Sequence, residues 1–176
     1  MEQSDKDLII ECQEGNTEAF GLLYDRYFKA IYTFIYYRTR QKEVAEDLTS
    51  QTFFKALRTI QSVDSNRPFS SWLYKIAHNT IIDHFKTRKP TVDIEEAQHV
   101  SMDDIGAPEM IDTAQEVERL KKHLAHLAPI ERDIIMMRIW QELSYREISE
   151  ILDKTEASLK MMYSRAMKKL KSMIQG

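Results

Sequence analysis

The C-terminal segment 144–171 constrains the fold most, because two helical patterns follow each other there with only three residues between them. The first begins with Ser144 and Glu147, a capping-box pair in which the hydroxyl accepts a backbone N–H and the carboxylate accepts the serine N–H. Apolar residues then recur at helical spacing, at Ile148, Ile151 and Leu152. Residues 153–155 interrupt this pattern, and Thr155 is a suitable cap for a second helix. The segment therefore predicts a helix, a tight turn and a helix.

The second of these helices separates apolar from basic residues. Its apolar side contains Leu159, Met162, Tyr163, Ala166 and Leu170. Its other side contains Lys160, Ser164, Arg165, Lys168, Lys169 and Lys171. A capped helix, a short turn and a longer basic helix are typical of a helix-turn-helix, whose second helix lies along DNA. The alternative is a helical hairpin whose charged side is only solvated, as most charged faces are.

Composition excludes several classes of protein. The chain has 176 residues, of which 43% are hydrophobic and 30% charged, enough apolar material for a core. Four Gly and four Pro favour helices over a turn-rich β fold. No apolar run approaches roughly 18 residues and the N-terminus is acidic, so we expect neither a membrane span nor a signal peptide. A single cysteine, Cys12, permits no internal disulfide and no cysteine metal site, which favours a cytoplasmic location.

Net charge is unevenly distributed along the chain. Residues 1–20 carry −5 and residues 21–92 carry +6, whereas residues 93–119 carry −8 and residues 120–176 carry +4. The total of −3 therefore conceals two basic blocks separated by an acidic one. Such local asymmetry, rather than the total, sets the field near a partner such as nucleic acid.

Helical periodicity predicts four helices in the first 90 residues. The expected ranges are 5–14, 17–40, 42–60 and a helix that Pro68 begins and Pro90 ends. Their apolar stripes, which we expect to be buried, include Tyr24, Leu57, Trp72 and Phe85. Phe54 instead falls on a polar face, where an apolar ring hints at a partner surface.

The character of the chain changes after residue 90. Periodicity lapses, acidic residues dominate, and we interpret residues 91–114 as a linker that is extended or only locally ordered. Helical patterns resume near Gln115 and supply the apolar support that the two C-terminal helices need. We therefore predict an all-α protein with two small helical domains, residues 1–90 and 115–176, joined by an acidic flexible linker.

Three stretches carry a resemblance to a known family. They are AEDLTSQTFFKAL (45–57), FSSWLYKIAHNTIIDHFKTRK (69–89) and LAPIERDIIMMRIWQELSYREISEILDKTEASLKMMYSRAMKKLK (127–171). Together they resemble the small bacterial sigma factors of the extracytoplasmic-function group, in the same order along the chain. The resemblance implies a specificity subunit of RNA polymerase that binds core polymerase and promoter DNA.

The resemblance also implies roles for particular residues of the first domain, residues 1–90. The helix bearing Asp47, Gln51 and Phe54 looks like the surface that binds the polymerase clamp. The following loop and helix look like the element that recognises and melts the −10 promoter element, by capturing an unstacked base and its flanking phosphates. The candidate residues are Ser65, Asn66, Arg67, Ser71, Lys75, Asn79, Lys86 and Arg88.

In the second domain, the resemblance places the DNA face for the −35 element on the second helix of the helix-turn-helix. The candidate residues are Ser158, Lys160, Ser164, Arg165 and Lys168. Arg165 and Lys160 offer charged donors to guanine or phosphate. A further implied partner is an inhibitory anti-sigma factor.

The turn of the helix-turn-helix departs from the family pattern. Asp153 and Lys154 stand where a glycine and an apolar residue are usual, and Ser149 stands where alanine is usual. Asp tolerates a left-handed backbone, so we expect the turn to survive. The stem of Lys154 either covers the lost apolar contact or leaves the turn more loosely packed.

No pattern predicts catalysis or a cofactor. His123 and His126 share a helix face and could hold a metal with a third ligand, but a surface or packing role is our expectation. Two other classes of protein remain open. One is a one-component regulator that binds duplex DNA unaided as a dimer, and the other is a helical adaptor whose basic faces bind an acidic protein.

Overall fold

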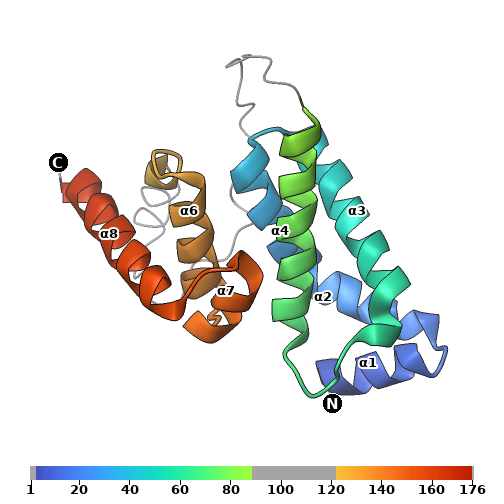
Figure 1. The fold of residues 1–176 in the computed structure, drawn as a ribbon. Helices are drawn as coiled ribbons and strands as arrows, with labels where there is room; N and C mark the ends of the chain where they lie inside the picture. Colours follow the sequence, from blue (N-terminus) through green and yellow to red (C-terminus); the bar gives the residue numbers. More distant parts are fainter. Residues whose placement is uncertain (1–2, 89–121, 176) are drawn as a thin grey trace. The chain divides into compact units, whose positions relative to one another are not determined.

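The computed structural model describes residues 3–88 and 122–175, and within these ranges it contains helices and no strand. The chain divides into two compact units, Met1–Val100 and Ser101–Gly176. The prediction of an all-α protein with two helical domains is confirmed (Figure 1). The predicted acidic linker, residues 91–114, lies outside the described residues, so its bounds stay a prediction.

Unit 1 contains four α-helices and one 3-10 turn among its described residues. They are α1 Asp5–Gln13, α2 Thr17–Thr39, α3 Lys42–Thr59, the turn η1 Ile60–Ser62 and α4 Phe69–Thr87. The starts of the first two follow from their caps, since Ser4 and Asp7 form a capping box and Asn16 accepts the N–H of Glu18 at 3.1 Å. Helices α2, α3 and α4 pack against one another, and α1 packs against α2 and η1 (Figure 1).

Most side chains that helical spacing predicts to be buried lie in the core of unit 1, and a few do not. Its fully buried side chains include Leu23, Ile31, Phe34, Leu48, Leu73, Tyr74 and Ile81. Three side chains expected in the core are exposed instead: Tyr24 at 37%, Leu57 at 42% and Phe85 at 44%. Leu57 lies at the edge of the buried face of α3, and Phe85 lies beyond Ile81, the last buried residue of α4. The Tyr24 ring packs on Phe53 at 4.7 Å and on Phe28 at 5.2 Å between ring centroids, and Phe28 is itself exposed at 37%.

Unit 2 begins, in the described part, with a helical turn at residues 122–124. It continues with α6 Pro129–Ile135, a π-helical turn Met136–Trp140, α7 Tyr145–Leu152 and α8 Glu156–Gln175. The predicted capping box is confirmed, because the Ser144 N–H donates to Glu147 at 2.7 Å and the Glu147 N–H donates to Ser144 Oγ at 3.2 Å. Helix α7 buries Ile148, Ile151 and Leu152, as its spacing predicts.

Helix α6 supports α8 through polar as well as apolar contacts. Lys169 Nζ donates to Glu131 Oε1 at 2.6 Å, and Glu131 also accepts the N–H of Ala128 at 3.1 Å. The buried Arg132 donates to the carbonyls of Leu124 and Leu127 at 3.0 and 3.1 Å, so the helical turn before α6 is held in place. No helix among residues 3–88 and 122–175 is long and apolar enough to cross a bilayer.

Candidate nucleic-acid interface

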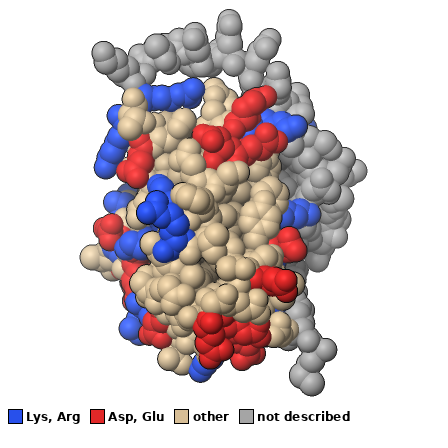
Figure 2. Space-filling model, turned by 90° about the vertical axis from the view of Figure 1, so that its right-hand side faces the viewer, with Lys and Arg blue, Asp and Glu red and all other residues tan. Residues whose placement is uncertain are grey.

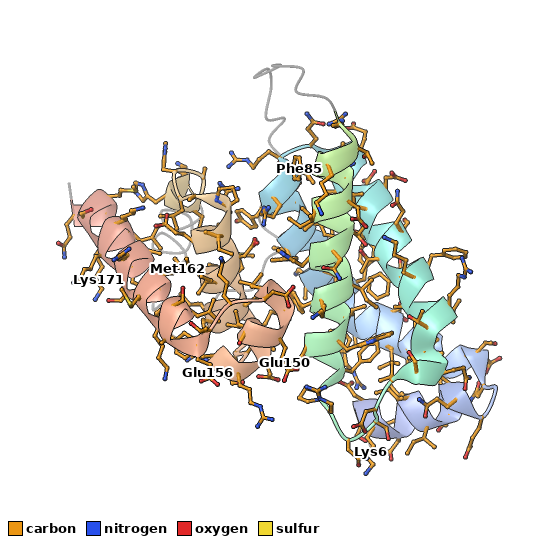
Figure 3. The ribbon with its side chains drawn as sticks, viewed as in Figure 1. Lys6, Phe85, Glu150, Glu156, Met162 and Lys171 are labelled. Atoms are coloured by element: carbon orange, nitrogen blue, oxygen red, sulfur yellow. The ribbon has the colours of Figure 1, made fainter. Side chains whose placement is uncertain are left out.

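Helix α8 has one buried side and one exposed basic side. Leu159, Ala166 and Leu170 are buried, and they recur at helical spacing against the rest of unit 2. The residues predicted to face the −35 element lie away from them: Lys160, Ser164, Arg165 and Lys168 are exposed, and Ser158 is half-buried. Figure 3 labels Glu156 at the start of this helix and Lys171 in its C-terminal part, and the exposed basic residues lie between these positions. The structure therefore places the whole predicted set on one helix and outside the core.

The turn before α8 is closed by residues that depart from the family pattern. Asp153 ends α7 in the left-handed region, with φ 51° and ψ 47°, and its N–H donates to the Ser149 carbonyl. Ser149 Oγ donates to the Lys154 carbonyl at 2.5 Å, a bond that alanine could not make. Lys154 is half-buried, which agrees with a stem that covers part of the turn. The start of α8 is capped by Thr155, whose Oγ1 accepts the Ser158 N–H at 3.2 Å.

Sequence reasoning missed Tyr145, the first residue of α7, whose ring contacts the basic side of α8. The Lys160 ammonium lies 5.6 Å from the centroid of the Tyr145 ring, and the Arg138 guanidinium lies 4.6 Å from it. Arg138 also donates to the Leu143 carbonyl at 2.5 Å. The ring of Tyr163 meets Tyr145 edge-on at 6.2 Å, and burial raises the pKa of the Tyr163 hydroxyl. The signal in the sequence that could have indicated this contact is an aromatic residue, Tyr145, directly after the helix cap Ser144.

The candidates for the −10 strand fall on one loop and one helix of unit 1. Ser65, Asn66 and Arg67 lie in the loop before α4, followed by Ser71, Lys75, Asn79 and Lys86 on α4, and by Arg88 just after it. The four on α4 share one side of the helix by spacing. Because its 19 residues span roughly 28 Å, the loop and Lys86 lie at opposite ends of the candidate surface. An extended nucleic-acid strand would be needed to touch both ends.

Trp72 was expected in the core, and the structure gives a different result. Its side chain is half-buried and packs on Phe69 at 5.5 Å between ring centroids. Phe69 is buried and meets the ring of Tyr27 edge-on at 5.4 Å. Trp72 therefore presents part of an indole ring near the start of α4, next to the candidate loop.

A separate surface lies on α3. Phe54 is exposed at 60%, as its place on a polar face predicts, and the Arg58 guanidinium lies 5.7 Å from its ring centroid. Gln51 Nε2 donates to Asp47 Oδ2 at 3.0 Å one turn away. The space-filling view of the side on which α3 lies shows a wide uncharged area with acidic and basic side chains around it (Figure 2). This surface thus combines an apolar ring with polar groups one and two turns away.

Electrostatics link α3 with the end of α4. Burial and the Arg88 guanidinium lower the pKa of His84, and the carboxylate of Asp47 opposes that shift. The neutral form of the His84 imidazole is therefore favoured. Its two charged neighbours are Asp47, a candidate for binding polymerase, and Arg88, a candidate for binding DNA.

The histidine pair of unit 2 gains no third ligand in the described part of the chain. The rings of His123 and His126 lie 6.4 Å apart between centroids. Within residues 3–88 and 122–175, no group of three His, Cys, Asp or Glu side chains is placed to hold a metal ion.

Comparisons with known proteins decide the family. A family model of sigma-70 region 2 matches residues 23–91, and one of sigma-70 region 4 matches residues 118–170. The RNA polymerase sigma factor YlaC of Bacillus subtilis is 30% identical over 152 residues, which cover 85% of this chain and 88% of YlaC. The extracytoplasmic-function sigma factor SigW of the same bacterium is 28% identical over 185 residues and covers 99% of both chains. The chain belongs to the extracytoplasmic-function sigma factors.

Other sigma factors extend the comparison. BldN of Streptomyces coelicolor is 32% identical over 171 residues, which cover 93% of this chain but only 63% of BldN. Among solved structures, that of CnrH in complex with the cytosolic domain of CnrY has a TM-score of 0.71 at 22% identity and covers 98% of both chains. The RpoE sigma factor of Bartonella quintana, solved with the anti-sigma factor NepR, has a TM-score of 0.68 at 20% identity and covers 90% of this chain and 98% of that one. These two structures support the fold of this sigma factor.

Proposed function

We propose that the two units of this sigma factor divide promoter recognition between them. Unit 2 reads the −35 element as duplex, with α8 in the major groove, and unit 1 binds core RNA polymerase and captures the −10 element as a single strand. The observation that carries the proposal is the division of α8, where Leu159 and Ala166 are buried while Lys160, Arg165 and Lys168 are exposed. A helix whose apolar side packs on its own domain and whose basic side is exposed can dock on duplex DNA. The hydrogen-bonded turn before α8 fixes the orientation of this helix.

The basic side of α8 offers two kinds of contact. Arg165 has the fork of donors that pairs with guanine O6 and N7, and lysines meet phosphates as point charges. Lys168 lies one turn beyond Ser164, so it falls near the DNA backbone when the start of α8 enters the groove. Ser158 and Ser164 add short polar side chains for base edges or phosphates.

The polymerase surface that we propose is centred on Phe54. Binding hot spots combine a well-packed aromatic anchor with surrounding groups that exclude water. Phe54 supplies the ring, and Asp47, Gln51 and Arg58 supply polar neighbours on the same helix. Leu57, which is exposed one turn away, adds apolar area to the anchor.

For the −10 element, the loop of unit 1 holds the base-reading groups and α4 holds the phosphate-binding groups. Asn66 and Arg67 are exposed, so their side chains are accessible to a base that has left the stack. Lys75, Lys86 and Arg88 follow along α4 and bind the flanking phosphates of the same strand. Opening the duplex costs stacking energy of roughly 1.4 kcal/mol per base step, which binding to core and capture of bases must offset.

The proposal includes regulation and location. CnrH and the Bartonella RpoE were solved with a protein that binds them, CnrY and the anti-sigma factor NepR respectively. By the same pattern, an anti-sigma factor inhibits this chain, in a stress or envelope response, by covering the surfaces that polymerase and DNA use. The chain acts in the cytoplasm, needs no cofactor and performs no bond chemistry, because polymerase catalyses the synthesis of RNA.

Reconstitution with core RNA polymerase tests the proposal. The chain is added to core enzyme with a library of DNA in which the −35 and −10 segments are randomised, and bound DNA and transcripts are sequenced. We expect enrichment at both segments and transcripts that begin downstream of them only when core enzyme is present. Selection of DNA by the chain alone would favour a one-component regulator, and binding of an acidic protein without promoter-dependent transcripts would favour an adaptor.

A further inference from the structure

The end of α1 is bonded to both ends of the turn that leads into the −10 loop. Gln13 Nε2 donates to the carbonyl of Ile60, the first residue of η1, at 3.1 Å and to the carbonyl of Val63, directly after η1, at 2.8 Å. Both bonds are partly buried. A further hydrogen bond runs from η1 to α1, since Gln61 Nε2 donates to the Cys12 carbonyl at 3.3 Å. The amide of Gln13 therefore fixes where the loop departs from α3.

The start of α1 contacts the loop itself. Lys6 Nζ donates to Asn66 Oδ1 at 3.0 Å, and Figure 3 shows Lys6 beside the loop that joins α3 to α4. Asp5, the neighbouring residue, accepts hydrogen bonds from Arg26 and Tyr27 of α2. Helix α1 is thus attached to α2 at its start and to the loop at both ends.

Two hydrogen bonds within the loop set its local shape. The Asn66 N–H donates to Asp64 Oδ1 at 2.9 Å, and the Arg67 N–H donates to the Asp64 carbonyl at 3.0 Å. These bonds form a local turn around Asp64 but do not fix the direction in which the turn projects. The contacts with α1 join the loop to the rest of unit 1.

The contact with Lys6 also sets which groups of Asn66 remain for a base. An amide has an acceptor oxygen and a donor NH₂ group, and an ammonium can only donate. Lys6 takes one of the two lone pairs of that oxygen and places a positive charge beside it, so a further donor is disfavoured there and a base acceptor that meets the NH₂ group is favoured. No described residue accepts a hydrogen bond from that NH₂ group.

We propose that α1 is the positioning element of the −10 loop, with Gln13 fixing the backbone of the loop and Lys6 setting the hydrogen-bonding pattern of Asn66. This inference rests on the proposed function of the loop in base capture. A loop held in its binding conformation loses less conformational entropy when a base enters, so discrimination between bases improves. Gln13 touches no DNA in this proposal and acts only through the loop.

The test uses holoenzyme assembled from the full chain and core polymerase, with the library whose −35 and −10 segments are both randomised. The variants are Gln13→Met, which keeps the length of the side chain but removes both donors, and Lys6→Met. The matched control is Gln3→Met, because the Gln3 amide donates to Glu11 within the N-terminal segment. The −35 segment serves as an internal control in every selection.

We expect Gln13→Met to lower base discrimination at the −10 segment by about fivefold, the usual effect of losing a net hydrogen bond, and to leave discrimination at −35 unchanged. We expect Lys6→Met to change the preferred base at one −10 position, since the Asn66 oxygen then has both lone pairs, and no neighbouring cation, to accept from a base amino group. Gln3→Met should select as the wild-type chain does.

Each other result has a defined meaning. If Gln13→Met and Lys6→Met both select as the wild-type chain does, α1 does not position the loop. If Gln13→Met lowers discrimination at −10 and −35 by the same factor, its effect is general destabilisation and the inference is wrong. Lys6 is exposed, so its variant reports on the loop even where Gln13→Met unfolds unit 1. If the wild-type holoenzyme enriches no DNA, the proposed function fails and the inference fails with it.

Discussion

The ring of Tyr145 connects two cations of unit 2 that lie far apart in the sequence. Arg138 belongs to the π-helical turn and Lys160 to α8, and both lie within 6 Å of the same ring centroid. A lysine side chain has four rotatable bonds, and an attractive ring limits the directions that its ammonium takes. The Tyr145 ring therefore orders the side chain of Lys160, one of the residues that we propose for the −35 contact.

We expect Tyr145→Leu to weaken binding of the −35 duplex by roughly fivefold, equivalent to about 1 kcal/mol, because an exposed cation–π contact is worth that amount. Tyr145→Phe keeps the ring and should bind nearly as the wild-type chain does. The measurement is a titration of holoenzyme against labelled −35 duplex at fixed salt. Equal loss in both variants would show that the hydroxyl, and not the ring, matters.

Single residues were predictable from the sequence where their partners are close in the chain. The capping pair Ser144 and Glu147 and the left-handed Asp153 needed only three or four residues of context. The bonds of Gln13 to Ile60 and Val63 join positions 47 and 50 residues apart, which no local pattern encodes. The same reason hid the contact between Lys160 and Tyr145.

At the scale of an element, periodicity gave the buried side of each helix but not the width of that side. Phe53 and Ala56 of α3 are buried, whereas Leu57, at the edge of the same stripe, is 42% exposed. The width depends on how closely neighbouring helices approach, which is set by their packing and not by the helix itself. Phe85 is exposed for a related reason, because the core ends before the last turn of α4.

The end of α2 offers a clean test of backbone strain. Arg40 ends the helix in the left-handed region, with φ 56°, and its N–H donates to the Tyr36 carbonyl at 2.8 Å. A Cβ in this region costs about 1–2 kcal/mol, and glycine avoids that cost at the expense of some unfolded-state entropy. We expect Arg40→Gly to be more stable than Arg40→Ala by about 1 kcal/mol.

Tryptophan fluorescence can measure this difference in the intact chain. The sequence has two tryptophans, Trp72 in unit 1 and Trp140 in unit 2. In a Trp140→Phe background, urea unfolding followed by fluorescence reports unit 1 alone. Both substitutions remove the same charge, so equal midpoints would mean that the left-handed conformation of residue 40 carries no strain.

For the whole molecule, the distribution of charge differs between the surfaces that we propose for DNA and for polymerase. The exposed side of α8 and the side of α4 that bears Lys75 and Lys86 are basic, whereas the surface around Phe54 on α3 combines an apolar ring with both signs of charge. Basic surfaces bind nucleic acid with strong dependence on salt, and mixed apolar surfaces bind proteins with weaker dependence. The family was predictable from the sequence because three motifs occur in a fixed order, whereas the task of each surface depends on partners outside the chain.

Two substitutions on different units test whether the surfaces act independently. Phe54→Ala removes the exposed anchor of α3, and we expect core polymerase to bind about thirtyfold more weakly, as for a hot spot worth about 2 kcal/mol. Arg165→Ala removes a forked donor from α8, and we expect about tenfold weaker discrimination at −35 with core binding unchanged.

Phe85→Ala and Lys171→Ala are the controls, since each removes an exposed side chain of the same kind outside the proposed contacts. Core affinity is measured by fluorescence titration and DNA preference by selection from the randomised library. If the two substitutions act independently, the double variant should show the core-binding loss of Phe54→Ala and the −35 discrimination loss of Arg165→Ala, each unchanged in its own measurement. Loss of core binding in Arg165→Ala, or of −35 discrimination in saturated Phe54→Ala holoenzyme, would contradict the division of tasks between the two units.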